Sequence, residues 1–196
     1  TEPQFVNTVH VQSAQEMYDA GMRYAPESDI IIKAAAVADY RPASVSDNKL
    51  KKGEGELSMP LERTTDILAA LGTAKKPGQF LCGFSMETEN MLENSRKKLE
   101  KKRLDLIAAN NVKVAGAGFA VDTNVLTLIG PDSVRELPLL SKDQAADALL
   151  DEILSAHPEI DFVQLQINYS DWENPGISSR ECWKIARKHG KSITVM

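Results

Sequence analysis

The chain has 196 residues, of which 42% are hydrophobic and 26% charged, a composition typical of a globular protein with one substantial core or a domain with a smaller appendage. Its formal net charge of -5 leaves no basic excess to neutralise the phosphates of a duplex, so we expect no nucleic-acid partner. The two cysteines and three histidines lack the spacing of a disulfide framework or a zinc site. No apolar run is long enough to cross a membrane, and the polar start at Thr1 is unlike a signal peptide, so we expect no membrane partner and a cytoplasmic location.

The first elements predict a strand, a helix and a second strand. Residues 5–11 alternate loosely between apolar and polar side chains, as strand residues do. Ser13 and Glu16 have the spacing of a capping box, and the helix that they open ends before Pro26. Residues 30–32 form a continuous apolar run of the kind found in strands covered on both faces. This order favours a parallel βαβ unit.

The end of the second strand is the first candidate site. Residues 34–38 are small and leave room for a ligand to approach the backbone, and Asp39, Tyr40 and Arg41 then supply polar groups. Ligands of open α/β sheets usually bind at the carboxyl ends of the strands. The same residues would also suit close helix packing followed by an ordinary polar loop, and this stretch alone leaves both interpretations open.

Residues 42–60 predict a long loop, and loops of this length in compact domains are commonly functional or disordered. The segment carries Lys49, Lys51 and Lys52. In an extended chain Lys49 and Lys51 point the same way, which would suit closure over phosphate oxygens. A solvated run of charge is the alternative interpretation.

Two predicted helices offer groups that could bind an anion. Residues 67–71 form a short helix with cap candidates at residues 64–66 and a glycine at its end. Its first amides could hold a ligand, or the helix start could be a simple cap. Residues 89–103 form a charged helix in which Lys98 and Lys102 are four residues apart and therefore share a face. A solvated surface is the alternative for that face.

The remaining pattern completes the expected fold class. Residues 80–84 and 104–109 are apolar runs typical of buried strands, and residues 117–120 with 125–129 predict an antiparallel hairpin at the sheet edge. Ser141 begins a helix that is followed by a strand, a helix and a strand. We therefore expect an α/β protein with a three-layer Rossmann-like sheet, mostly parallel with an antiparallel edge hairpin, plus a C-terminal αβαβ segment.

Six features occur in order along the chain: residues 34–41, 49–52, 65–67 and 83–88, the pair Lys98 and Lys102, and residues 105–110. Over about residues 3–140 they resemble phosphopantothenoylcysteine synthetase, the ligase of coenzyme A biosynthesis that is often the C-terminal half of a bifunctional flavoprotein. The resemblance implies that CTP and Mg2+ activate the carboxylate of 4'-phosphopantothenate as an acyl-cytidylate. The amine of cysteine then displaces CMP.

The resemblance also assigns residues and partners. Lys49 would stabilise charge on the reacting phosphate and is the catalytic candidate, while no metal ligand is assigned. A homodimer is expected in the family, and a decarboxylase domain could adjoin the ligase in the full-length protein. The nucleotide contacts carried over by position are Ala34, Ala35, Asp39, Lys49, Thr65, Asp66, Ile67, Leu68, Phe84, Lys98 and Lys102.

Both ends of the chain depart from the family. Its N-terminal glycine- and serine-rich segment has no counterpart in this sequence, so we expect part of the site to be absent. Residues from about 150 to 196 resemble part of an aldo/keto reductase barrel, in which Gln164 would match a strand glutamine that touches the nicotinamide. We therefore divide the chain into a synthetase-like domain, residues 1–140, and a C-terminal segment, residues 141–196.

Three interpretations of function stay open. The first is the ligase, and the second is a truncated or recombined α/β protein without catalysis. The third is a nicotinamide-dependent oxidoreductase fragment, against which the absence of a reductase tetrad argues. The C-terminal segment is also a sound αβ unit in its own right, and we expect it to add two parallel strands to the sheet.

Overall fold

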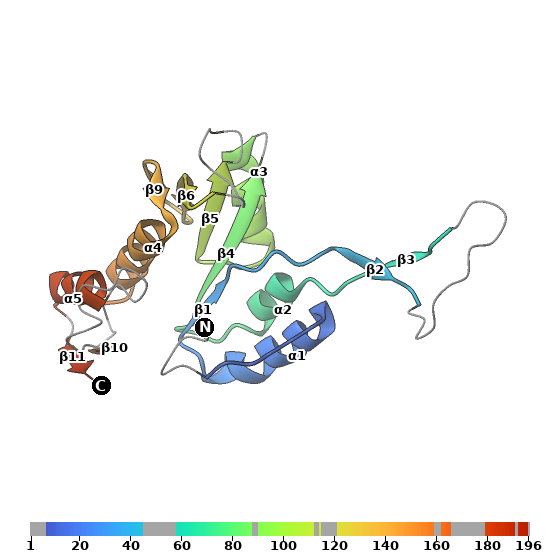
Figure 1. Cartoon of the computed structure of the whole chain (residues 1–196), viewed down its shortest axis with the longest axis horizontal. Coiled ribbons are helices and arrows are strands. Elements are labelled where there is room, and N and C mark those ends of the chain that lie inside the picture. Colours follow the sequence, from blue (N-terminus) through green and yellow to red (C-terminus); the bar gives the residue numbers. More distant parts are fainter. Residues whose placement is uncertain are drawn as a thin grey trace.

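A computed structural model describes residues 7–44, 58–87, 90–111, 114, 121–158, 162–165, 179–190 and 192–195. Its central feature is a five-stranded sheet in the order β1-β4-β5-β7-β8 (Figure 1). The strands are β1 (Ile30–Lys33), β4 (Phe80–Glu87), β5 (Leu106–Asn111), β7 (Leu126–Ile129) and β8 (Val134–Glu136). In the described part of the chain, no helix is long and apolar enough to span a membrane.

The directions of the strands confirm an α/β, Rossmann-like sheet. β1, β4 and β5 are parallel neighbours, with Ile31 opposite Leu81 and Cys82 opposite Leu106. β7 runs antiparallel to both β5 and β8, so it alone opposes the common direction of the strands in this sheet. The antiparallel edge hairpin is therefore β7–β8. Residues 117–120, which were expected to pair there, lie outside the described residues.

Helix α1 (Ala14–Tyr24) forms as expected, but the strand predicted before it does not. Residues 7–12 adopt no regular structure, and Val9 is 46% exposed, so the alternation there does not mark a buried face. At the start of α1, the Ser13 hydroxyl accepts a hydrogen bond from the Glu16 amide, and the Glu16 carboxylate accepts one from the Gln12 amide. The reciprocal bond thus falls one residue earlier than in a capping box. The short helix η1 (Ala25–Glu27) follows.

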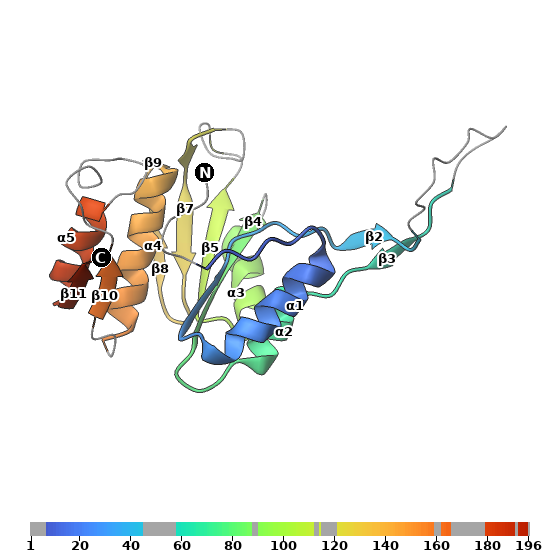
Figure 2. The same cartoon turned by 60° about the horizontal axis from the view of Figure 1, so that its bottom comes forward.

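The sheet carries a hydrophobic core on each face. Helices α1, α2 (Ile67–Ala74) and α3 (Met91–Lys101) cover one face, where Leu81 and Ile107 are buried. Helix α4 (Lys142–Ala156) covers the other face, where Cys82 and Leu128 are buried. Because successive strand residues point to opposite faces, the neighbours Leu81 and Cys82 enter different cores. Figure 2 shows these layers, with α4 and the pair α1 and α2 on opposite sides of the sheet.

Glycine allows close packing around α2. A Cβ added at Gly72 would lie 1.8 Å from the carbonyl oxygen of Lys102, and one added at Gly83 would lie 2.6 Å from Leu68. These approaches let α2 lie directly against the end of α3 and against β4. The last turn of α2, which contains Gly72, is thereby held beside the end of α3.

Strands β2 (Tyr40–Pro42) and β3 (Leu61–Arg63) form an antiparallel ribbon that extends away from the sheet (Figures 1 and 2). Arg41 and Glu62 pair across the ribbon at 2.7 Å. The Arg63 guanidinium lies over the Tyr40 ring, 5.7 Å from its centroid. The ribbon flanks the segment predicted as a long loop, of which residues 45–57 lie outside the described residues.

Helix α4 belongs to the main core. The short pair β6 (Thr123–Asn124) and β9 (Leu140–Ser141) leads into the helix, which Ser141 and Gln144 begin with a complete capping box. Its Ala145, Leu149 and Ile153 are buried with residues of β4, β5 and β7. The core therefore continues past residue 140, and the division of the chain at that residue stays a prediction.

The C-terminal strands do not extend the main sheet. β10 (Phe162–Leu165) and β11 (Ser192–Val195) are parallel and flank α5 (Ser179–Lys188). Within the described ranges these two strands pair only with each other. The expectation that the tail adds two strands to the sheet is therefore wrong, and α5 packs on α4 instead.

Candidate ligand-binding site

A pocket of about 500 Å³ lies at the carboxyl ends of β1, β4 and β5, on the face that α4 covers. Ile32 and Ala34 line it from the end of β1, Phe84 from β4 and Leu149 from α4. The small residues that follow β1 keep this space open, as the sequence predicted. Ligands of open α/β sheets bind at this end of the strands, so the pocket is the leading candidate site.

Few polar groups line the pocket, and one of them is unsatisfied. Ser85, Asn110, Asn124 and Lys142 are its polar lining residues. The Oδ1 atom of Asn110 is buried and has no hydrogen-bond partner among the described residues. A buried polar atom without a partner is costly. The carboxamide of Asn110 is therefore a candidate to bond a ligand.

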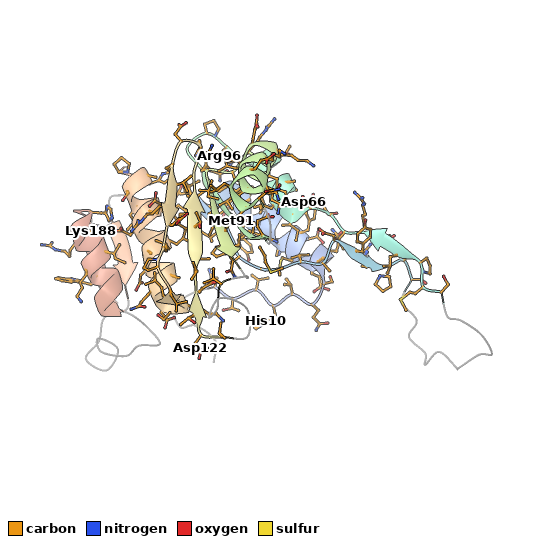
Figure 3. The ribbon with its side chains drawn as sticks, turned by 90° about the horizontal axis from the view of Figure 1, so that it is seen from above. His10, Asp66, Met91, Arg96, Asp122 and Lys188 are labelled. Atoms are coloured by element: carbon orange, nitrogen blue, oxygen red, sulfur yellow. The ribbon has the colours of Figure 1, made fainter. Side chains whose placement is uncertain are left out.

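Lys33, Lys102 and Asp66 form a cluster on the face of the sheet opposite the pocket. Lys33 directly follows the pocket residue Ile32 in β1, so its side chain points to the other face. Lys102 Nζ lies 2.9 Å from Oδ2 of Asp66, which Figure 3 labels, and Lys33 Nζ donates to the Ala35 carbonyl at 2.7 Å. Asp66 also caps α2 by accepting from the Ala69 amide at 3.0 Å.

The charges in this cluster shift one another's pKa values. Burial lowers the pKa of Lys33 and nearby Lys102 lowers it further, while Asp66 and Asp39 act in the opposite direction. Burial raises the pKa of Asp66, but the hydrogen bonds from Lys102 and the Ala69 amide and the two lysine charges outweigh it, so this pKa is also lowered. The ammonium groups of Lys33 and Lys102 lie beside the first amides of α2, where phosphate groups bind well, and the carboxylates of Asp66 and Asp39 balance their charge.

Lys98 lies apart from this cluster. It forms an ion pair with Glu87 at the end of β4, whose side chain is only 10% exposed. Beside them, the hydroxyl oxygens of Ser85 and Ser95 lie 3.4 Å apart. Lys98 and Lys102 were predicted to share a face, and in the structure each is held by a different carboxylate.

The structure brings together part of the predicted site. Ala34, Ala35 and Phe84 line the pocket. Asp66 and Lys102 form the cluster at the start of α2. These two groups lie on opposite faces of the sheet near the end of β1, so a single ligand would have to cross the sheet edge to touch both.

The other predicted residues are placed differently. The side chains of Ile67 and Leu68 are buried in the core, which leaves only their backbone amides for a ligand. Thr65 and Asp39 are exposed. Lys49, the catalytic candidate, lies outside the described residues. The assigned roles of all these residues stay predictions.

Sequence reasoning missed the wall that α4 provides. Lys142, Ala145 and Leu149 line the pocket, but the sequence predicted only a helix that begins at Ser141. It also missed Asn110, whose signal was its place at the end of an apolar strand. This position predicts a polar residue at the carboxyl ends of the strands, but it does not show whether the hydrogen bonds of that residue are satisfied.

The described residues support neither a metal site nor a cysteine nucleophile. These contain no group of three or more His, Cys, Asp or Glu side chains arranged to hold a metal ion. Burial raises the pKa of the Cys82 thiol to about 12. A thiol with this pKa stays protonated at neutral pH and is a poor nucleophile.

Comparison with known proteins gives the family context. The model of the family described as "DNA/pantothenate metabolism flavoprotein C-terminal domain" matches residues 1–156. The coenzyme A biosynthesis bifunctional protein CoaBC of Bacillus subtilis is 48% identical over 146 residues, which cover 74% of this chain and 36% of that protein. The protein of the same name from Vibrio vulnificus (strain YJ016) is 43% identical over 153 residues, covering 77% of this chain and 38% of the relative. The chain thus spans well under half of these relatives.

The solved structures agree with this result. The crystal structure of the C-terminal domain of a coenzyme A biosynthesis bifunctional protein CoaBC matches with a TM-score of 0.65 and 41% identity. The match covers 80% of this chain and 71% of that one. The matched region therefore shares both its fold and much of its sequence with that domain.

Proposed function

The chain belongs to the family of the DNA/pantothenate metabolism flavoprotein C-terminal domain, and from this membership we propose that it is a ligase of coenzyme A biosynthesis that joins 4'-phosphopantothenate to cysteine. In the proposed reaction, a carboxylate oxygen of 4'-phosphopantothenate attacks the α-phosphorus of CTP and pyrophosphate leaves. The amine of cysteine then attacks the acyl carbon of the acyl-cytidylate, and CMP leaves with the carboxyl oxygen. An amide bond is formed and a phosphoanhydride bond is consumed.

The observation that carries this proposal is the pairing of two unlike subsites at the end of β1. The pocket behind Ile32 and Phe84 is mostly apolar, while Lys33 and Lys102 supply positive charge on the other side of the strand. Such a pair suits a substrate with one uncharged part and one phosphate-bearing part. A nucleoside triphosphate has this character, and so does 4'-phosphopantothenate.

The residues would act by charge neutralisation and positioning. Attack on a phosphoryl group needs stabilisation of the charge that spreads over its oxygens and needs no protein nucleophile. Lys33, Lys102 and the first amides of α2 would hold phosphate oxygens, and Asp66 would keep Lys102 in place through their ion pair. Lys49 remains the proposed group for the reacting phosphate.

The proposal includes Mg2+ as a companion of the nucleotide, and it assigns no protein ligand to the ion. Mg2+ is usually bound by one or two carboxylates together with substrate phosphates. When bound, it would neutralise part of the phosphate charge.

Isothermal calorimetry with CTP and Mg2+ tests the binding step, and release of pyrophosphate in the presence of both other substrates tests the chemistry. Lys49→Ala should slow pyrophosphate release by about 100-fold, the usual cost of losing one group that stabilises a transition state. Lys52→Ala removes the same charge from the same segment and should change the rate little. A folded chain that binds no CTP would reject the proposal and favour the interpretation as an α/β protein without catalysis.

A further inference from the structure

Helix α4 has two packed faces, one toward the pocket and one toward the tail. Ala145, Ala146 and Leu149 line the pocket. Asp147, Ala148 and Asp151 line a groove of about 280 Å³ against α5. Figures 1 and 2 both show α4 between the sheet and α5. Any contact that holds α5 against α4 therefore acts on the helix that forms one wall of the pocket.

Asp151 makes polar contacts between the two helices. Lys188 Nζ lies 2.7 and 2.8 Å from its two carboxylate oxygens, and His189 Nε2 lies 2.8 Å from one of them. The side chains of Asp151 and His189 are 15% and 14% exposed, and Ala186 of α5 is 1% exposed. The contact thus joins the largely buried Asp151 carboxylate to the His189 ring and to the ammonium of Lys188, whose side chain is 63% exposed. Lys188 is labelled on α5 in Figure 3.

The same carboxylate also faces the edge of the sheet. Arg135 of β8 lies 3.8 Å from Asp151 and 3.0 Å from Glu152. Asp151 therefore links β8, α4 and α5, whereas Glu152 pairs with Arg135 alone among the partners described for it. Neighbouring carboxylates on one helix thus differ in whether they contact the tail.

We propose that Asp151 is a positioning residue, which clamps α5 to the outer face of α4 and thereby holds the inner face of α4 as the wall of the pocket. The coupling is short, because Leu150 and Leu149 line the pocket one and two residues before Asp151 and belong to the same turn of α4. Loss of the clamp removes the contacts of Asp151 with Lys188 and His189 and releases α5. The last turns of α4 then lose their packing on one side.

The role of Asp151 rests on the proposed function, which assigns the pocket to a substrate. Ligand affinity is therefore one readout, and a second readout must be independent of any ligand. Hydrogen exchange, read by mass spectrometry over residues 143–156 and 179–188, supplies it. Asp151→Asn keeps the size of the side chain and removes its charge. Lys188→Met breaks the same contact from the other helix, and Glu152→Gln is the matched control.

Asp151→Asn and Lys188→Met should both speed hydrogen exchange in α5 and in the pocket-facing turns of α4. Both variants should also bind CTP with Mg2+ about fivefold more weakly, which is a modest coupling. Glu152→Gln should leave exchange in α5 and the affinity unchanged. Faster exchange confined to α5, or equal effects from Glu152→Gln, would overturn the proposal. If the unmodified chain binds no CTP, the proposed function fails by itself, and exchange in α4 still decides the role of Asp151.

Discussion

Lys102 and Asp66 tie the end of α3 to the start of α2, with Nζ of Lys102 2.9 Å from Oδ2 of Asp66. The same carboxylate accepts a hydrogen bond from the Ala69 amide in the first turn of α2. One side chain therefore serves as a helix cap and as the counter-ion of a lysine in the candidate phosphate site. Substitution can separate these two roles.

Asp66→Ala should lower the free energy of unfolding by about 1 kcal/mol, the usual cost of losing a helix cap. Asp66→Asn should cost less, because asparagine caps helices as well as aspartate does and the lost ion pair is half exposed. Urea unfolding followed by circular dichroism measures both values. Equal losses in the two variants would show that the charge of Asp66, and not its cap, stabilises the fold.

Lys102→Ala should weaken binding of CTP with Mg2+ about tenfold, because it removes one charge-assisted contact to a phosphate. Lys97→Ala is the matched control, since Lys97 is 70% exposed and pairs with Glu93 on the same helix. Calorimetry at low and high salt measures the affinities, and the difference between the variants should shrink as salt rises. The same affinity in both variants would remove Lys102 from the site.

The sequence was sufficient to predict the strand that ends at the pocket. An apolar run at residues 30–32 followed by small residues indicates a strand with space at its end, and the structure has the strand and the pocket there. The expectation that this strand is covered on both faces is wrong, because β1 lies at the edge of the sheet and Ile32 is 45% exposed. The cap at Asp66 was equally local, because it depends on one side chain and an amide three residues away. Features of this kind depend on neighbours in the chain, which a sequence displays directly.

Features that depend on distant partners were not predictable. Residues 5–11 have a strand-like alternation, yet the described residues 7–12 form no strand, because periodicity does not show whether a neighbouring strand is available. The tail strands β10 and β11 were expected to join the main sheet and pair with each other instead. The role of α4 as a pocket wall and the unsatisfied Asn110 oxygen also arise from contacts across the fold.

Gly72→Ala and Gly21→Ala should have opposite effects on stability. A Cβ at Gly72 would lie 1.8 Å from the Lys102 carbonyl oxygen, so α2 must move away from the end of α3. A Cβ at Gly21 meets nothing within 4 Å, and alanine in a helix is favoured over glycine by about 1 kcal/mol. Thermal unfolding should therefore give a lower Tm for Gly72→Ala and a higher one for Gly21→Ala. Similar Tm values would contradict the close packing of α2.

Ala35→Leu should block the pocket without unfolding the protein. Ala35 is exposed and lines the pocket, so a larger side chain would occupy space meant for a ligand and change stability by only about 0.5 kcal/mol or less. Ala38→Leu makes the same change at another exposed position of this segment, away from the pocket. Calorimetry should show that only Ala35→Leu loses CTP binding. Intact binding in Ala35→Leu would place the nucleotide elsewhere.

Asp151 should make the free energy of unfolding depend on pH in the acidic range. Burial raises the pKa of its carboxyl group, but the hydrogen bonds and charges of Lys188 and His189 outweigh burial, so the pKa is lowered from the ordinary value of 3.8. A carboxylate with a lowered pKa contributes stability that is fully present above its unfolded-state pKa and is lost as the pH falls through its folded-state pKa. Its partners here, Arg135, Lys188 and His189, all favour the ionised form.

The unmodified chain should therefore be more stable than Asp151→Asn near neutral pH, and the difference should shrink as the pH falls below about 4. Urea unfolding of both proteins between about pH 6 and about pH 3 measures this difference. Glu152→Gln controls for the general loss of a carboxylate on α4, because Arg135 of β8 is the ion-pair partner described for Glu152. A constant difference across this range would mean that Asp151 is not ionised in the folded protein, and the clamp between α4 and α5 would then be a neutral hydrogen bond.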